Sequence, residues 1–192
     1  MGKAESVGST REAILGAAED LFARQGYTAT TIAEVASTVG IQGPAIYKHF
    51  ASKRALFDEV LERVFAPFLA LVQIEETRAG NLEAIVQRHL DNPNAARIVQ
   101  HATLSGGEDF TLLVERWYRP FFADLQEQQA APANGKQWRR NAVRISAFHS
   151  LLLGYLSLAP LHAAVLGYEP LDAKSIAELL ALQSQLAQQV DW

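Results

Sequence analysis

The spacing of apolar residues constrains this chain most, because it is helical along the whole sequence and nowhere alternates over the length of a useful strand. The clearest short stripe has the i, i+3, i+4, i+7 spacing of one buried helix face. Its members are Ile32, Val35, Ala36 and Val39. A longer stripe runs from Leu56 to Val72. The sequence therefore predicts an all-α protein.

Helix start and stop signals are sharpest in the N-terminal third. The segment Ser9–Glu12 has the S-x-x-E form of a capping box and predicts a first helix over 10–25, which Gly26 ends. Ser52 can cap another helix further along, and the long apolar stripe continues that helix to Val72. This long helix is expected to lead out of a small N-terminal module.

Between these two elements, the pattern predicts two short helices. Thr31–Glu34 repeats the capping box and opens a helix over 32–39, and the turn Gly40–Gln42 follows. A helix is then expected over Pro44–Phe50, because proline suits the first turn of a helix. Two short helices joined by a tight turn and preceded by a third form a candidate helix-turn-helix.

Turn signals divide the rest of the chain into further helices. The predicted ranges are Leu82–Leu90, Ala95–Leu104, Asp109–Gln129, Lys136–Leu166 and Ala173–Val190. We expect two domains: a helix-turn-helix DNA-binding domain over 1–55, and a helical effector-binding and dimerisation domain over 56–192.

Several classes of protein are excluded by what the sequence lacks. It has no cysteine, which removes disulfide scaffolds, thiolate zinc sites and thiol nucleophiles. Residues 1–13 are polar and have no apolar core of a secretory signal, so a cytoplasmic protein is expected. No enzyme motif is present, and the histidines lack metal-ligand spacing, so we expect no enzyme, metal or cofactor. The histidines are His49, His89, His101, His149 and His162.

Charge is distributed unevenly along the chain. The formal net charge of −4 argues against a polyanionic partner. However, residues 1–54 carry six basic and five acidic side chains, so 11 basic and 16 acidic side chains remain from the totals of 17 and 21. No acid lies between Glu34 and Asp58, an interval that contains Lys48, Lys53 and Arg54. A small basic patch is thus predicted on an acidic protein, although chance solvation of a surface explains such a patch equally well.

One internal stretch, 145–168, has no charged residue and is long enough to raise the question of a membrane span. It contains serines, histidines and a proline, and the mean hydropathy of the chain is zero. Burial of a soluble helix on two faces, against its own core and against another chain, is the preferred interpretation.

The short third helix carries the candidate chemistry. Lys48 can contact a phosphate or the edge of a guanine, and Tyr47 and His49 can donate hydrogen bonds to phosphate. The small residues at the start of this helix allow its N-terminus to approach the major groove closely. A lysine in the next helix adds a phosphate contact. The candidate DNA-binding residues are Thr31, Gly43, Pro44, Ala45, Tyr47, Lys48, His49 and Lys53. The alternative is a solvated helix end with an ordinary tyrosine against the core.

The segments T-T-I-A-E-V-A-S-T-V-G-I (30–41) and G-P-A-I-Y-K-H-F-A-S-K-R-A-L-F (43–57) resemble the DNA-binding domain of TetR/AcrR transcriptional regulators. Arg54 and Ala55 depart from the family pattern. Gly43 and Ala45, at the positions of base readers, donate no side-chain hydrogen bond, which leaves the operator sequence open. The resemblance implies a homodimer formed by helices 136–166 and 173–190, and a C-terminal pocket for a small effector.

An aromatic cluster supplies candidates for that pocket, although core packing is the commoner fate of such a cluster. The candidate effector-binding residues are Arg97, His101, Phe110, Trp117, Tyr118, Phe121, Arg144, His149 and Tyr155. Such a pocket would favour an apolar or aromatic molecule, and one of the two arginines could meet an anionic group.

The resulting prediction is a regulator, most simply a repressor, that a small effector releases from a palindromic operator. A helical carrier or adaptor that binds a small molecule without DNA is the alternative. Salt-dependent binding to the upstream DNA distinguishes the two.

Overall fold

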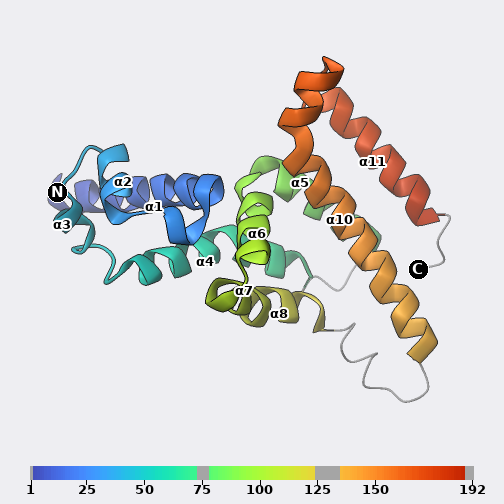
Figure 1. The fold of residues 1–192 in the computed structure, drawn as a ribbon, viewed down its shortest axis with the longest axis horizontal. Coiled ribbons are helices and arrows are strands. Elements are labelled where there is room, and N and C mark those ends of the chain that lie inside the picture. The colour runs from blue at the N-terminus through green and yellow to red at the C-terminus, as the bar shows by residue number, and fades with distance from the viewer. Residues whose placement is uncertain (1, 73–77, 124–134, 189–192) are drawn as a thin grey trace.

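The computed structural model describes residues 2–72, 78–123 and 135–188, and the regular structure of these residues is helical throughout (Figure 1). The first helices are α1 (Gly2–Ala29), α2 (Ile32–Thr38), α3 (Gly43–Ile46) and α4 (Lys53–Val72). The middle of the chain forms α5 (Arg78–Asp91), α6 (Asn94–Ser105), α7 (Gly107–Leu113), a π-helical turn (Val114–Tyr118) and α8 (Arg119–Phe121). The last are α10 (Gly135–Leu166) and α11 (Ala173–Gln188). The predicted all-α class is confirmed.

Two predicted helix ends in the N-terminal third are wrong. The first helix begins at Gly2, so residue 9 lies inside it and does not cap it. The third helix ends at Ile46 instead of Phe50, and residues 47–49 form a turn. Ile46 and Phe50 are buried in the core, with 0% and 2% of their surface exposed, and the residues between them form a hydrogen-bonded turn in which the amides of His49 and Phe50 both donate to the carbonyl of Ile46.

The prediction of one continuous helix over 109–129 is also wrong. Its described part divides into α7, the π-helical turn and α8, whereas residues 124–129 and most of the predicted turn at 130–135 lie outside the described residues. Pro120 explains the break, because its ring would clash with the carbonyl of Arg116 in a regular helix. The helix instead forms the wider π-helical turn, in which the amide of Arg119 donates to the carbonyl of Val114.

The main core joins the first helix to the middle of the chain. Helix α1 packs against α4 and α6, and side chains from all three helices share one buried cluster with Trp117 of the π-helical turn. A smaller cluster of Val86, Ala96, Leu152 and Leu156 joins α5 and α6 to α10. In Figure 1, the helix-turn-helix therefore lies at one end of the molecule, and α10 and α11 at the other.

Helix α10 contains the charge-free stretch, and only one side of it is covered. By length and composition alone, Trp138–Leu166 is apolar enough to cross a membrane, and 17% of its most apolar window is buried in the chain. Leu152, Leu156 and Ala159 are buried, whereas Leu161 and Val165 are 56% and 70% exposed. The predicted burial against the chain's own core is present, and a second apolar face is left exposed.

Candidate nucleic-acid interface

The start of α2 is fixed by the predicted capping box. The amide of Glu34 donates to Thr31 Oγ1 at 3.2 Å, and the amide of Thr31 donates to Glu34 Oε2 at 2.8 Å. The Thr31 hydroxyl also donates to that carboxylate, and this hydrogen bond lowers the pKa of Glu34. Thr31 thus has a structural role, and its DNA contact stays a prediction.

The turn between α2 and α3 depends on one glycine. Gly40 has φ +70°, which favours glycine, and the amide of Ile41 closes the end of α2 by donating to the carbonyl of Ala36 at 2.9 Å. The chain then extends through Gln42 and enters α3 with Pro44 in the first turn. This geometry places α3 directly after α2, as a helix-turn-helix requires.

Three predicted DNA-contacting side chains lie together in the turn after α3. Ile46 points into the core, which leaves Tyr47 and Lys48 exposed and His49 half-buried. Tyr47 has 56% of its surface exposed, so it is not an ordinary core tyrosine. The predicted small residues Gly43, Pro44 and Ala45 occupy the adjacent helix and add no bulky side chain that would keep DNA away.

Lys53 lies at the start of α4, beside this surface. Its Nζ lies 4.3 Å from the centre of the Tyr27 ring and 3.4 Å from the carbonyl oxygen of Thr28, and partial burial lowers its pKa. The Ser52 hydroxyl accepts from the amide of Ala55 at 3.0 Å, which confirms the predicted cap. Lys53 is therefore held close to the helix-turn-helix rather than extended into solvent.

Sequence reasoning missed Gln42 as a candidate DNA contact. Its side chain is exposed and makes no capping hydrogen bond, and it immediately precedes the small residues of α3. A glutamine amide can form paired hydrogen bonds with adenine in the major groove. The signal was available in the sequence, because Gln42 is the polar residue next to Gly43 and Pro44.

The predicted effector residues divide into several locations. Tyr118, Phe121 and His149 do come together: the Tyr118 hydroxyl and His149 Nε2 are 3.3 Å apart, and both Phe121 and His149 contact the ring of Phe122. Burial lowers the pKa of His149 to about 4 and raises that of Tyr118. This group joins the π-helical turn and α8 to α10 and stays a candidate effector contact.

The remaining predicted effector residues lie elsewhere. Trp117 packs on Phe65 in the main core, and the Tyr155 hydroxyl donates to the carbonyl of Pro170 at 2.7 Å. His101 lies against Gly26 and lines a cavity of only about 10 Å³, whereas Phe110 is exposed. Arg97 and Arg144 are half-buried on α6 and α10.

The capped α2, the glycine turn and the anchored α3 define a helix-turn-helix protein with a larger helical region attached. Residues 14–60 match the family described as "Bacterial regulatory proteins, tetR family". The chain therefore carries the N-terminal helix-turn-helix domain of the TetR family, a family of transcriptional regulators and not of enzymes, in agreement with the prediction.

Two curated relatives are similar to part of the chain. The HTH-type transcriptional repressor KstR2 of Rhodococcus jostii is 31% identical over 115 residues, which cover 55% of this chain and 56% of that protein. The HTH-type transcriptional regulator AcrR of Shigella flexneri is 43% identical over 74 residues, which cover 38% and 29%. The chain thus spans about half or less of the length of these relatives.

Solved structures match most of the chain. The transcriptional regulator SCO4942 of Streptomyces coelicolor has a TM-score of 0.62 at 18% identity and covers 92% of this chain and 97% of that one. NalD of Pseudomonas aeruginosa, the secondary repressor of the MexAB-OprM multidrug efflux pump, has a TM-score of 0.57 at 26% identity and covers 94% and 96%. The similarity in fold therefore extends beyond the helix-turn-helix to the C-terminal helices.

Proposed function

We propose that this protein is a cytoplasmic transcriptional repressor that binds a palindromic DNA operator as a homodimer. The observation that carries the proposal is the exposed surface of Tyr47 and Lys48 beside the small residues of α3. Two such surfaces in a dimer would enter successive major grooves about 34–36 Å apart. The similarity to KstR2 and NalD, both named as repressors, supports repression over activation.

The proposed dimer forms through α10 and α11. Leu158, Leu161 and Val165 share one face of α10 at helical spacing and are 47%, 56% and 70% exposed in the single chain. Leu182 of α11 is 48% exposed as well. An exposed apolar helix face of this kind is typical of a protein interface, and a second copy of the chain supplies the same apolar chemistry.

The proposed effector is a small apolar or aromatic molecule that contacts the group formed by Tyr118, Phe121 and His149. Tyr118 and Phe121 lie on elements that pack against α4, which leads directly to the helix-turn-helix, whereas His149 reaches them from α10. An effector that binds more tightly to the dimer unable to bind DNA would shift the population away from the operator-bound form. Helix α4 would transmit the displacement.

The test measures binding to a fragment of the protein's own upstream DNA at two salt concentrations. Lys48→Ala and Tyr47→Ala should each abolish the specific gel shift while the dimer remains folded. Lys174→Ala removes the same charge from the exposed start of α11 and should leave the shift unchanged. Unchanged shifts for both helix-turn-helix variants would contradict the assignment. Absence of binding even at low salt would favour the small-molecule carrier.

A further inference from the structure

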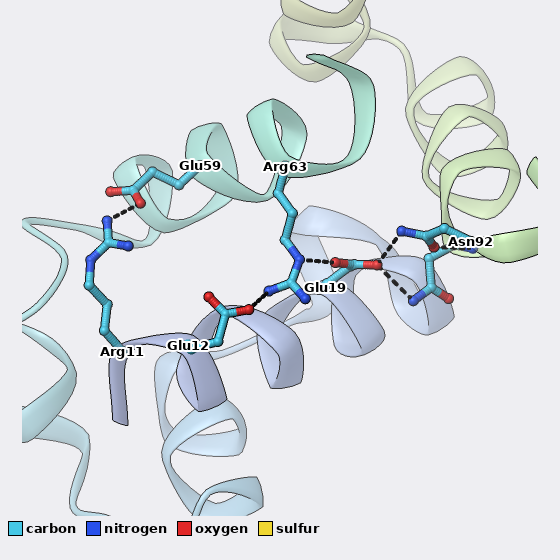
Figure 2. Close-up of polar contacts among 7 residues, drawn as sticks. Arg11, Glu12, Glu19, Glu59, Arg63 and Asn92 are labelled. Atoms are coloured by element: carbon cyan, nitrogen blue, oxygen red, sulfur yellow. Dashed lines mark hydrogen bonds and ion pairs between the residues drawn. The ribbon is translucent and has the colours of Figure 1, made fainter. Parts of the chain in front are cut away.

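The carboxylate of Glu19 lies in the middle of α1, at the junction of the helix-turn-helix with the rest of the chain (Figure 2). Only 6% of this residue is exposed. Arg63 of α4 approaches one oxygen, with its Nε 3.2 Å from Oε2. The amides of Asn92 and Asn94 donate to the other oxygen, Oε1, at 2.8 and 3.2 Å. Both oxygens are thus occupied from opposite sides.

The two asparagines form a rigid donor pair at the turn between α5 and α6. The Asn92 side-chain oxygen accepts from the backbone amide of Asn94 at 3.1 Å, and the intervening Pro93 restricts the backbone. The Asn94 amide also donates to Asp20 at 2.9 Å, so the turn holds two neighbouring carboxylates of α1. This turn belongs to the larger helical region of the chain, over 56–192, and it contacts α1 through these two carboxylates.

On its other side, Glu19 is linked to α4. Arg63 pairs with both Glu12 and Glu19, and these two acids lie two helical turns apart on α1. Among the other ion pairs that join residues 1–55 to the larger helical region, Arg11 with Glu59 is exposed on both partners and is screened by water, whereas Arg54 with Asp109 lies at the start of α4 and α7, away from the α5–α6 turn. Glu19 is the buried acid, and a buried carboxylate is stable only with its partners in place.

We propose that Glu19 is a positioning residue that sets the orientation of the helix-turn-helix relative to the C-terminal region. This inference rests on the proposed function as a dimeric DNA-binding protein. In such a dimer, the orientation of each helix-turn-helix determines the distance between the two recognition helices. Glu19 therefore determines which spacing between operator half-sites the dimer accepts, without touching DNA and without affecting which bases each half-site contains.

The experiment selects DNA from a pool of random half-sites separated by spacers of different lengths, using the full-length protein. The wild type should prefer one spacing by about 10-fold, a coupling of ordinary size. Glu19→Ala, and independently the double variant Asn92→Ala/Asn94→Ala, should select the same half-site bases but lose that preference between neighbouring spacings. Glu62→Gln, which removes an exposed ion pair of α4, is the matched control and should keep the wild-type spacing.

The possible outcomes separate the inference from the proposed function. If the wild type selects no DNA, the proposed function fails and the inference fails with it. If the wild type selects a site and the Glu19 and asparagine variants keep its narrow spacing, only the positioning role is overturned. Thermal melts check folding, and the asparagine variant tests the same contacts if Glu19→Ala does not fold. A merely structural role would weaken binding to all spacings equally, which also overturns the inference.

Discussion

Gly26 provides the sharpest stability test of this structure. It has φ +77° and ψ 171°, a conformation that is essentially restricted to glycine, where α1 passes into the helix-turn-helix. A Cβ at this position would lie 3.2 Å from Nδ1 and 3.3 Å from Cγ of His101 on α6. The substitution Gly26→Ala therefore introduces two separate costs, one in the backbone and one in the contact with His101.

The two costs have comparable magnitudes. Backbone strain of this kind costs about 1–3 kcal/mol, and overpacking against His101 costs about 1–3 kcal/mol more. Gly26→Ala should thus lower the free energy of unfolding by about 2–6 kcal/mol. For a chain of this size, such a change lowers the melting temperature by roughly 4–24 °C. The comparison must use equal protein concentrations, because the stability of a dimer depends on concentration.

A double-mutant cycle with His101→Ala separates the two costs. Removing the imidazole relieves the contact but not the backbone strain, so Gly26→Ala should cost only about 1–3 kcal/mol in the His101→Ala background. Denaturant unfolding of the four proteins measures each step. The reasoning is refuted if Gly26→Ala is as stable as the wild type, or if its cost is the same in both backgrounds.

Two further predictions concern pH and assembly. Burial lowers the pKa of His149 from its ordinary 6.5 to about 4. As the pH falls, the imidazole is therefore protonated first in the unfolded chain. The free energy of unfolding should decrease between pH 6.5 and pH 4, by at most about 3 kcal/mol. Denaturant unfolding across this range should show a smaller decline for His149→Phe, and an identical decline would contradict the shift. Leu161→Asp should convert the dimer to a monomer in light scattering, whereas Leu104→Asp, at a residue 86% exposed on α6, should remain dimeric. Loss of the dimer in both variants, or in neither, would contradict the proposed interface.

The sequence predicted the helix-turn-helix well because its signals are local. The capping box of Thr31 and Glu34 is formed within one turn of a helix. The end of α2 is set by the positive φ of Gly40, which the residue type itself allows. The length of α3 was beyond such signals. It depends on how the chain turns between Ile46 and Phe50 so that both enter the same core, which is a property of packing and not of spacing.

The effector residues were harder to predict for a related reason. Helical spacing indicates which side chains share a face, but not which neighbouring helix that face meets. Trp117 and Tyr118 are adjacent in sequence, yet one packs on Phe65 of α4 and the other meets His149 of α10. The break at Pro120 makes the directions of these side chains harder to predict, because residues of a π-helical turn point in other directions than they would in a regular α-helix.

The fold also changes what the charge distribution implies for DNA binding. Arg11 pairs with Glu59, and Arg54 pairs with Asp109 at 2.8 Å, so two of the basic residues counted in the N-terminal region are already neutralised by acids outside it. Lys48 is exposed beside α3, and Lys53 is held nearby on Tyr27. Few phosphate contacts are then available to each protomer, and each contributes about −0.9 to the salt dependence of binding. Affinity for random DNA should be weak, so selectivity must come from base contacts and from the spacing of the two recognition helices.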